Sequence, residues 1–178
     1  MTAIAKKWFR DIAGLSLLLL LGGCCSHSPG QYNVSIGMGP SLRGDTVMVD
    51  IVGVNDSEYD KWANYSMTQY WTAADPLRAD AVKYTLLFDA KSATTQVFKQ
   101  DNPIWQKWRQ VHARRLFILA NLPGVFEDQP GNQDPRRVIL PLDQCRWRLS
   151  WFSSVDPIKI QAQSSGLDVL TPPQPKKK

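Results

Sequence analysis

The chain has few of the side chains from which catalytic and metal sites are built. Its 178 residues include only two histidines, His27 and His112, and three cysteines, Cys24, Cys25 and Cys145. Two adjacent cysteines and a distant third form neither a disulfide framework nor a zinc pattern. A Cys25–Cys145 pairing stays open, because an exported protein meets oxidising conditions.

No set of residues suited to catalysis or cofactor binding is recognisable. His112 is followed closely by Arg114 and Arg115, whose charges oppose a protonated imidazole. No G-x-S-x-G motif supplies a serine partner, and Cys145 has only His112 as a base. Gly37-Met38-Gly39 lacks the strand and helix of a phosphate loop. We therefore predict a protein that is not an enzyme and holds no cofactor and no metal.

Basic charge is concentrated at the two ends of the chain. The net charge is +5 and the pI is about 9.2. Removing residues 1–23 takes away three basic residues and Asp11, so the charge falls to +3. The terminal run Lys176–Lys178 equals that remainder. The middle of the chain is close to neutral, so the charge does not indicate a nucleic-acid partner.

The N-terminal apolar run is too short to cross a membrane. Ile12–Leu21 spans ten residues, whereas a spanning helix needs about 20. Lys6, Lys7 and Arg10 precede the run, and Leu21-Gly22-Gly23-Cys24 ends it. A basic start, an apolar middle and small residues before a cleavage point are typical of a secretory signal peptide.

The ending of this segment resembles the bacterial lipobox, an apolar residue and two small residues before a cysteine. The resemblance implies cleavage before Cys24 and a diacylglycerol on its sulfur, which attaches the chain to a lipid bilayer. Cys25 stands where an aspartate would mark retention in the inner membrane, so we expect the outer membrane, facing the periplasm. The expected parts are a signal peptide (1–23), a tether (24–31), one domain (32–170) and a disordered basic tail (171–178).

Short strands dominate the expected domain. β-branched and apolar runs bounded by turn residues predict eight of them. They are Thr46–Val54, Lys83–Phe88, Thr94–Phe98, Arg115–Leu122, Arg137–Leu142, Trp147–Phe152, Ile158–Ala162 and Leu167–Leu170. Asp89–Ser92 is expected to be a hairpin turn. No alternation of strands with long helices is present, so the pattern indicates a mostly-β fold, a single β-sandwich with one or two short helical insertions.

Two segments interrupt the strands. Ser66 followed by Gln69 fits a capping box that opens a short helix. In Asp101–Ala113, Asn102 and Pro103 suit the cap and first position of a second helix. Its apolar residues fall at helical spacing, which predicts a helix packed on the sheet.

An acidic turn and two arginine-containing segments are interpreted as surface features. Glu127, Asp128, Asn132 and Asp134 offer oxygen ligands but lack the EF-hand spacing. We expect a solvated loop in which aspartates pair with Arg136 and Arg137. On the adjoining strands, including the one that carries Arg146-Trp147-Arg148, arginines are expected to face outward.

The candidate binding site is an aromatic segment in the long connection between Asn55 and Val82. It contains Trp62, Tyr65, Tyr70 and Trp71 and few aliphatic residues. Long connections in small domains are often functional, and rings with polar groups suit interfaces. Two interpretations stay open, a lid packed over the sandwich and a surface that binds a partner.

The order of these elements resembles the small outer-membrane lipoprotein of the type VI secretion membrane complex. A lipobox is followed by the strand Val47–Val54, the aromatic insertion, the apolar strand Leu116–Leu122, a strand preceded by arginines (Arg136–Leu142) and short closing strands (Ile158–Leu170). The resemblance implies a transthyretin-like sandwich that binds the periplasmic end of a large inner-membrane partner through a loop after its first strand. By position, that loop corresponds to the segment of Trp62, Tyr65, Tyr70 and Trp71.

We therefore predict a membrane-anchored, non-catalytic protein that binds another envelope protein. The alternative is an envelope lipoprotein that binds glycan or peptidoglycan, since Trp and Tyr beside Arg suit sugars. A third class, an envelope hydrolase, would depend on Cys145 or His112.

Overall fold

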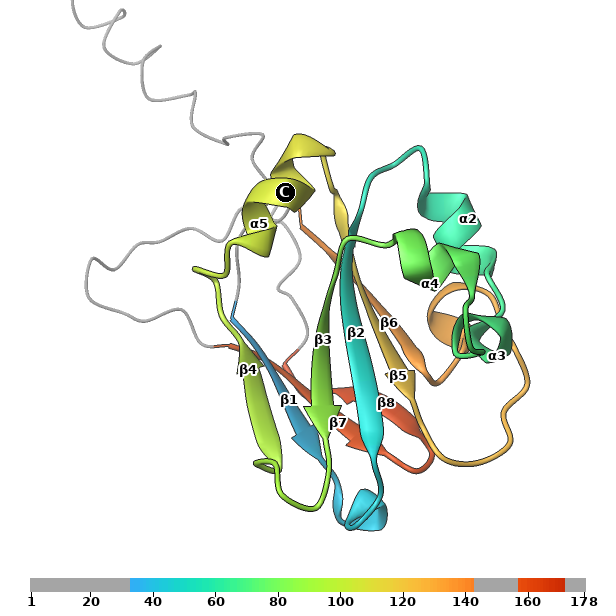
Figure 1. Cartoon of the computed structure of the whole chain (residues 1–178), viewed down its shortest axis with the longest axis vertical. Helices are drawn as coiled ribbons and strands as arrows, with labels where there is room; N and C mark the ends of the chain where they lie inside the picture. Colours follow the sequence, from blue (N-terminus) through green and yellow to red (C-terminus); the bar gives the residue numbers. More distant parts are fainter. Residues whose placement is uncertain (1–32, 143–156, 172–178) are drawn as a thin grey trace, which may run out of the picture.

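A computed structural model describes residues 33–142 and 157–171 as two four-stranded sheets packed face to face (Figure 1). One sheet has the strand order β4-β1-β7-β8, and the other has the order β3-β2-β5-β6. Neighbouring strands are antiparallel except β1 and β7, which run parallel with Val34 opposite Ile158. The predicted mostly-β sandwich is confirmed.

The elements have the following bounds. The strands are β1 (Val34–Met38), β2 (Val47–Val54), β3 (Lys83–Phe88), β4 (Thr95–Phe98), β5 (Arg115–Asn121), β6 (Arg137–Pro141), β7 (Ile158–Gln163) and β8 (Gly166–Val169). The helices are α2 (Tyr59–Asn64), α3 (Met67–Tyr70), α4 (Pro76–Asp80) and α5 (Ile104–Gln110), with two 3-10 turns, η1 (Pro40–Leu42) and η2 (Gly131–Gln133).

Seven predicted strands agree with β2 to β8 to within one residue at each end. The eighth prediction, Trp147–Phe152, lies outside the described residues, as do the signal peptide, Cys24, Cys25 and Cys145. Strand β1 was missed, because Gly37 and Gly39 lower its strand propensity. It is nevertheless the second strand of its sheet, hydrogen-bonded to β4 and β7.

The predicted hairpin at Asp89–Ser92 is wrong. The turn exists, and the Asp89 carboxylate accepts hydrogen bonds from the backbone N–H groups of Lys91 and Ser92. However, β3 pairs with β2 while β4 pairs with β1. The turn therefore carries the chain from one sheet to the other, and local sequence does not distinguish this connection from a hairpin.

The sheet containing β2 is covered on both faces, which explains the nearly continuous apolar sequence of β2 and β5. The inner face joins the core between the sheets through residues such as Val49 and Ile118. The outer face forms a second core, in which Val52, Phe117 and Leu119 pack under α2 to α4.

Helix α5 lies at one end of the sandwich, and its expected packing is confirmed (Figure 1). Trp105 and Trp108 are buried in the core between the sheets. Gly53 on β2 makes room for this helix, because a Cβ added there would overlap the Trp108 indole. The helix begins one residue later than predicted, with the Asn102 side chain accepting a hydrogen bond from the Ile104 N–H at 3.0 Å.

The region between β2 and β3 holds three short helices, more than the insertion predicted from Ser66. The predicted cap is confirmed, since the Ser66 hydroxyl accepts from the Gln69 N–H at 2.9 Å. Asp75 caps α4 in the same way, accepting from the Arg78 N–H at 2.8 Å, with Pro76 at the first helical position. Within the described ranges, no helix is long and apolar enough to cross a membrane.

Candidate functional site

The four aromatic residues predicted to bind a partner lie in what we call the helical segment, Tyr59–Asp80. This segment carries α2, α3 and α4 across the outer face of the β2 sheet (Figure 1). Trp62 and Tyr70 are buried, whereas Tyr65 and Trp71 are half-buried. In this arrangement Trp62 and Tyr70 support the segment from beneath, and Tyr65 and Trp71 reach its surface.

Aromatic contacts link the segment to the sheet. The Trp62 ring lies 6.0 Å from that of Phe117 on β5 and 6.1 Å from that of Tyr70. Tyr70 contacts Trp71 edge to face, with centroids 5.2 Å apart. The Arg78 guanidinium lies over the Trp71 ring at 4.5 Å, a cation–π contact. These contacts give the segment an apolar attachment to the sheet.

A buried carboxylate provides a second attachment. Asp50 is fully buried in the middle of β2. It accepts hydrogen bonds from the Arg78 Nε at 2.8 Å, the Tyr70 hydroxyl at 3.0 Å and the Thr85 hydroxyl at 2.5 Å. Burial, followed by the negative charge of Asp50, raises the pKa of Tyr70 far above its usual range. The phenol therefore remains a donor, and Asp50 connects α3 and α4 to β2 and β3.

The loop between β5 and β6 holds the start of α3. Asp128 accepts hydrogen bonds from the Ser66 hydroxyl, from the N–H and hydroxyl of Thr68, and from Arg136 at 2.6 Å. Burial alone would raise the pKa of Asp128, but these donors outweigh it and hold the pKa well below its usual range. Arg136 also pairs with the buried Asp134 at 2.8 Å. This loop and α3 are thus joined by charged hydrogen bonds.

Arg137 fixes the end of α2. Its side chain is fully buried, and it donates hydrogen bonds to the carbonyl oxygens of Trp62 and Ala63 at 2.6 Å and of Tyr65 at 3.1 Å. A fourth bond goes to the Gln129 carbonyl at 3.0 Å. Carbonyls at the end of a helix have no partner within the helix, so a single guanidinium satisfies several of them. Burial lowers the pKa of Arg137, and the charge of Asp134 opposes that change.

The buried charged residues contradict one prediction from the sequence and include one residue, Asp50, that was not predicted. Glu127, Asp128 and Asn132 are exposed, and Asp134 pairs with arginine, as predicted. However, Asp134, Arg136 and Arg137 are buried, so the prediction that these two arginines face outward was wrong. The sequence analysis also missed Asp50. A single acid inside the β-branched run around it is an unusual pattern, and it was the available signal.

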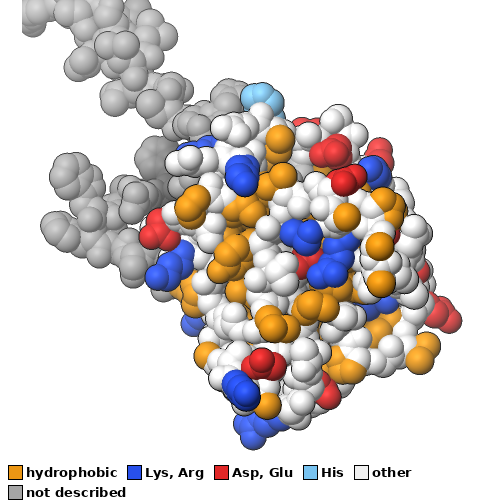
Figure 2. Space-filling view, in the orientation of Figure 1, with side chains coloured by type: hydrophobic (Ala, Val, Ile, Leu, Met, Phe, Trp, Pro, Cys, Tyr) orange, Lys and Arg blue, Asp and Glu red, His pale blue; other side chains and the backbone are white. Residues whose placement is uncertain are grey.

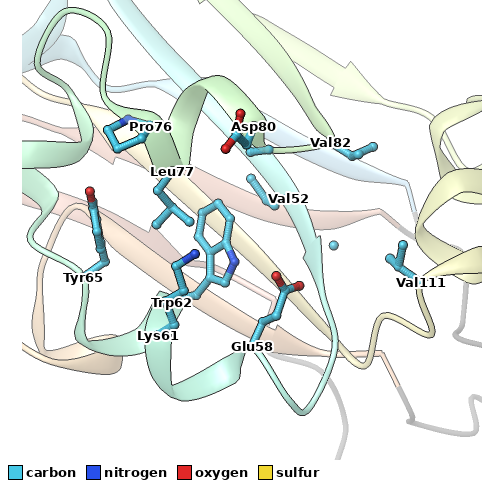
Figure 3. Close-up of a pocket in the computed structure, with 12 residues that line it drawn as sticks. Val52, Glu58, Lys61, Trp62, Tyr65, Pro76, Leu77, Asp80, Val82 and Val111 are labelled. Carbon is cyan, nitrogen blue, oxygen red and sulfur yellow. The ribbon is translucent and has the colours of Figure 1, made fainter.

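A groove of about 460 Å³ opens beside the segment (Figure 3). Its apolar lining includes Val52 from the sheet, Trp62 from α2 and Leu77 from α4. Val82 and Val111 are among its exposed residues, at 41% and 43% exposure. Such a groove suits an apolar side chain of a binding partner.

Charged residues stand around the groove. Glu58 comes from the start of α2, Asp80 from the end of α4, and Lys61 from α2. All three are exposed, and none takes part in an ion pair found among the described residues. In Figure 2 acidic side chains gather at the upper right, where Figure 1 shows α2. The groove therefore combines an apolar lining with unpaired charges that a partner can meet.

The other candidate residues do not converge on a site. His112 is exposed and follows α5 with a left-handed backbone, φ 55°. Among the described residues, no three His, Cys, Asp or Glu side chains are grouped so as to hold a metal ion. Cys24, Cys25 and Cys145 lie outside the described ranges.

The presence of β1 changes which loop follows the first strand. With Val47–Val54 taken as the first strand, the aromatic segment fell in that loop. Because β1 precedes it, the loop after the first strand is Gly39–Thr46, with η1 inside it. This loop lies at the opposite end of β2 from the helical segment and α5.

Two four-stranded sheets with short helices on an outer face and at one end define a transthyretin-like β-sandwich. The membrane-bound type VI secretion component Lip of Serratia marcescens has this fold: it is 12% identical over 80% of this chain and 98% of that chain, with a TM-score of 0.50. A structure described as the C-terminal domain of the type VI secretion protein TssM from EAEC matches at 13% identity, 78% and 99% coverage, and a TM-score of 0.50.

A third solved structure, the type VI secretion lipoprotein TssJ1 of Pseudomonas aeruginosa, matches at 13% identity over 83% of this chain and 99% of that chain, with a TM-score of 0.48. No protein-family model and no curated protein matches the chain. At these identities the likeness to the Lip and TssM structures shows the fold, and the predicted resemblance is confirmed at that level.

Proposed function

We propose that this chain is the lipid-anchored, non-catalytic subunit of a type VI secretion membrane complex and binds a larger envelope protein. The observation that carries the proposal is the fold likeness to Lip, which covers 98% of that chain. The lipobox ending at Cys24 supports it independently, because an acylated N-terminal cysteine attaches a protein to one leaflet. We place the protein at the outer membrane, facing the periplasm.

The charged groups of the helical segment support a binding role rather than a catalytic one. Asp50, Asp128 and Asp134 are fully engaged in holding helices and loops in place. Chemistry requires titratable groups that can reach a substrate. Asp50 and Asp134 are fully buried, and the partly exposed Asp128 is engaged by Ser66, Thr68 and Arg136. The exposed features of the segment are instead the groove and the half-buried rings of Tyr65 and Trp71.

We propose the groove and these two rings as the main partner surface. Tyr65 lines the groove, and Trp71 lies on the same segment but lines a separate hollow with Met67 and Thr68. Half-buried aromatics and an apolar groove with charged edges match the usual composition of interaction surfaces. The loop Gly39–Thr46 is the second candidate, since it occupies the position that the resemblance assigns to partner binding. The two surfaces lie far apart on the domain, so one experiment can separate them.

The experiment begins with acylation and ends with partner capture. Labelled fatty acid in growing cells and the mass of the mature protein test modification at Cys24, with Cys24→Ala as the control. The full chain is then purified in mild detergent with envelope proteins cross-linked to it. We expect one large envelope protein to be recovered in a constant ratio to the purified chain.

Three variants locate the surface. Glu58→Lys/Asp80→Lys reverses charge at the groove, Arg43→Glu/Asp45→Lys alters the loop after β1, and Lys91→Glu is a matched surface control. All five residues are exposed, so folding is expected to persist. If only the groove variant fails to recover the envelope protein, the result supports the helical segment as the binding site. If only the loop variant fails, the binding site is the loop Gly39–Thr46.

Recovery of no envelope protein from acylated chain would contradict the proposal. Muropeptide-dependent quenching of tryptophan fluorescence would then favour the glycan-binding alternative, since Trp62 lines the groove.

A further inference from the structure

We infer that the end of the sandwich carrying α5 faces the membrane, and that its basic side chains contact anionic phospholipid headgroups. The inference rests on the proposed lipid attachment at Cys24. It concerns the cations around α5 rather than the groove, which borders α5 at Val111, and it assigns the orientation of the domain on the leaflet.

The first observation is where the described chain begins. Asn33 precedes β1 at the α5 end of the sandwich, since its side chain accepts a hydrogen bond from the Gln100 N–H just before α5. Asn33 lies nine positions after Cys24. A chain of that length reaches at most about 30 Å, so the α5 end starts close to the lipid anchor.

The second observation is where the described chain ends. The Thr171 hydroxyl accepts a hydrogen bond from the Lys159 N–H at 2.7 Å, and the Ile158 N–H donates to the Asn33 carbonyl at 2.8 Å. The last described residue therefore lies at the same end as the first. Lys176–Lys178 follow within seven residues of Thr171, a reach of about 25 Å.

The third observation is that the cations around α5 are free. Lys99, Lys107 and Arg109 are exposed, and none takes part in an ion pair found among the described residues. The nearest acid in sequence is Asp101, which takes part in no ion pair found among the described residues. Asp56 faces Arg115 at 3.8 Å. By contrast, Arg78, Arg136 and Arg137 are all engaged in internal contacts.

The remaining surfaces are less suited to an anionic leaflet. At the opposite end Arg43 and Lys91 are balanced by Asp45 and Asp89. The helical segment presents exposed acids, which anionic headgroups repel. Attachment through the single residue Cys24 does not by itself decide which face of the domain meets the lipid, so the free charges select that face. Each basic residue near an anionic surface favours that orientation by about fivefold.

The test measures lysine reactivity on acylated full-length protein. The protein is placed in vesicles of phosphatidylethanolamine with phosphatidylglycerol, in vesicles of phosphatidylcholine, and in detergent. Acetylation of single lysines by a water-soluble reagent is followed by mass spectrometry. On the anionic vesicles we expect Lys99 and Lys107 to react about fivefold more slowly than in detergent. Lys91, at the opposite end, should react at an unchanged rate.

Two controls sharpen the result. About 0.5 M NaCl should restore the reactivity of Lys107, since exposed charges are screened by salt. Lys107→Glu/Arg109→Glu should restore the reactivity of Lys99, whereas Arg43→Glu/Lys91→Glu should leave Lys99 protected.

Equal reactivity of Lys91 and Lys107 on anionic vesicles, or equal protection of Lys107 on neutral vesicles, would overturn the inference and leave the proposed function intact. Absence of acylation at Cys24, read from the mass of the mature protein, would overturn both.

Discussion

Helix α5 and the helical segment are attached to the same sandwich by different interactions. The attachment of α5 is mainly apolar, through the buried indoles of Trp105 and Trp108, whose N–H groups also donate to the Lys99 and Val82 carbonyls. Its cations remain free. The helical segment combines aromatic packing with buried ions from Asp50, Asp134 and Arg137. Buried charges are costly unless they are fully paired, so they hold a segment in one specific position. The difference predicts that the two attachments respond differently to mutation and to pH.

The largest expected effect is on the ionic attachment. Arg137→Ala removes the donor that serves three carbonyls at the end of α2 and one in the loop before β6. We expect the free energy of unfolding to fall by about 3 kcal/mol, the usual cost of leaving buried polar groups unpaired. Urea unfolding followed by tryptophan fluorescence measures it.

Hydrogen exchange locates the damage in the Arg137 variant. Amides of the helical segment should exchange faster, while those of α5 keep their protection. Arg43→Ala, which removes an exposed arginine, is the control. Equal stability of the two variants would show that Arg137 does not hold the segment.

The next effect concerns the apolar attachment of α5. In Gly53→Ala the new methyl group overlaps the Trp108 indole, so α5 must shift. We expect a loss of about 2 kcal/mol, typical of overpacking in a core. Gly37→Ala is the matched strand control, because its Cβ meets nothing closer than the Thr95 hydroxyl at 3.4 Å. Here hydrogen exchange should increase in α5 and not in the helical segment, the reverse of the Arg137 result.

The sequence predicted the apolar attachment better than the ionic one, for a physical reason. Ile104, Trp105 and Trp108 reveal a packed face within a single helix, because their spacing is local. Three of the four carbonyl partners of Arg137 are more than 70 positions away, at Trp62, Ala63 and Tyr65. Nothing near Arg137 in the sequence records them, so its burial was not predicted.

The strands show the same limit. Local alternation placed β2 to β8 correctly, since each strand carries its own pattern. The pairing of β4 with β1 depends on residues about 60 positions apart, such as Phe98 and Val34, and the turn before β4 was therefore misinterpreted. The lipobox at Cys24 was recognised from sequence and stays a prediction.

A smaller effect, dependent on pH, is expected at Asp128. Its pKa in the folded chain lies below that of the unfolded chain, where the pKa of aspartate is about 3.9. Its contribution to stability is therefore present above about pH 4 and is lost as the pH falls further. Asp128→Asn lacks this contribution at every pH. We expect it to be about 1 kcal/mol less stable than the native chain near neutral pH, since Asp128 is partly exposed.

Unfolding free energies measured at neutral and at acid pH check the assignment of Asp128. The difference between the native chain and Asp128→Asn should shrink as Asp128 becomes protonated. Asp45→Asn, at an exposed aspartate of the opposite end, should show little difference at either pH. If the difference in unfolding free energy between the native chain and Asp128→Asn stays constant down to strongly acid pH, the role of the Asp128 charge is contradicted.

The smallest effect is expected at the C-terminus of α5, and it is a gain. His112 follows the helix cap with φ 55°, a left-handed conformation that glycine adopts more easily. The backbone bonds His112 N–H to Arg109 carbonyl and Ala113 N–H to Trp108 carbonyl close a Schellman motif, which requires this conformation. His112→Gly should therefore raise the free energy of unfolding by about 0.5–1 kcal/mol. His112→Ala removes the same imidazole but keeps the Cβ, so it should give no gain. If both variants were equally less stable, the imidazole itself would stabilise the end of α5, and the comparison of a mainly apolar attachment with an ionic one would have to include His112.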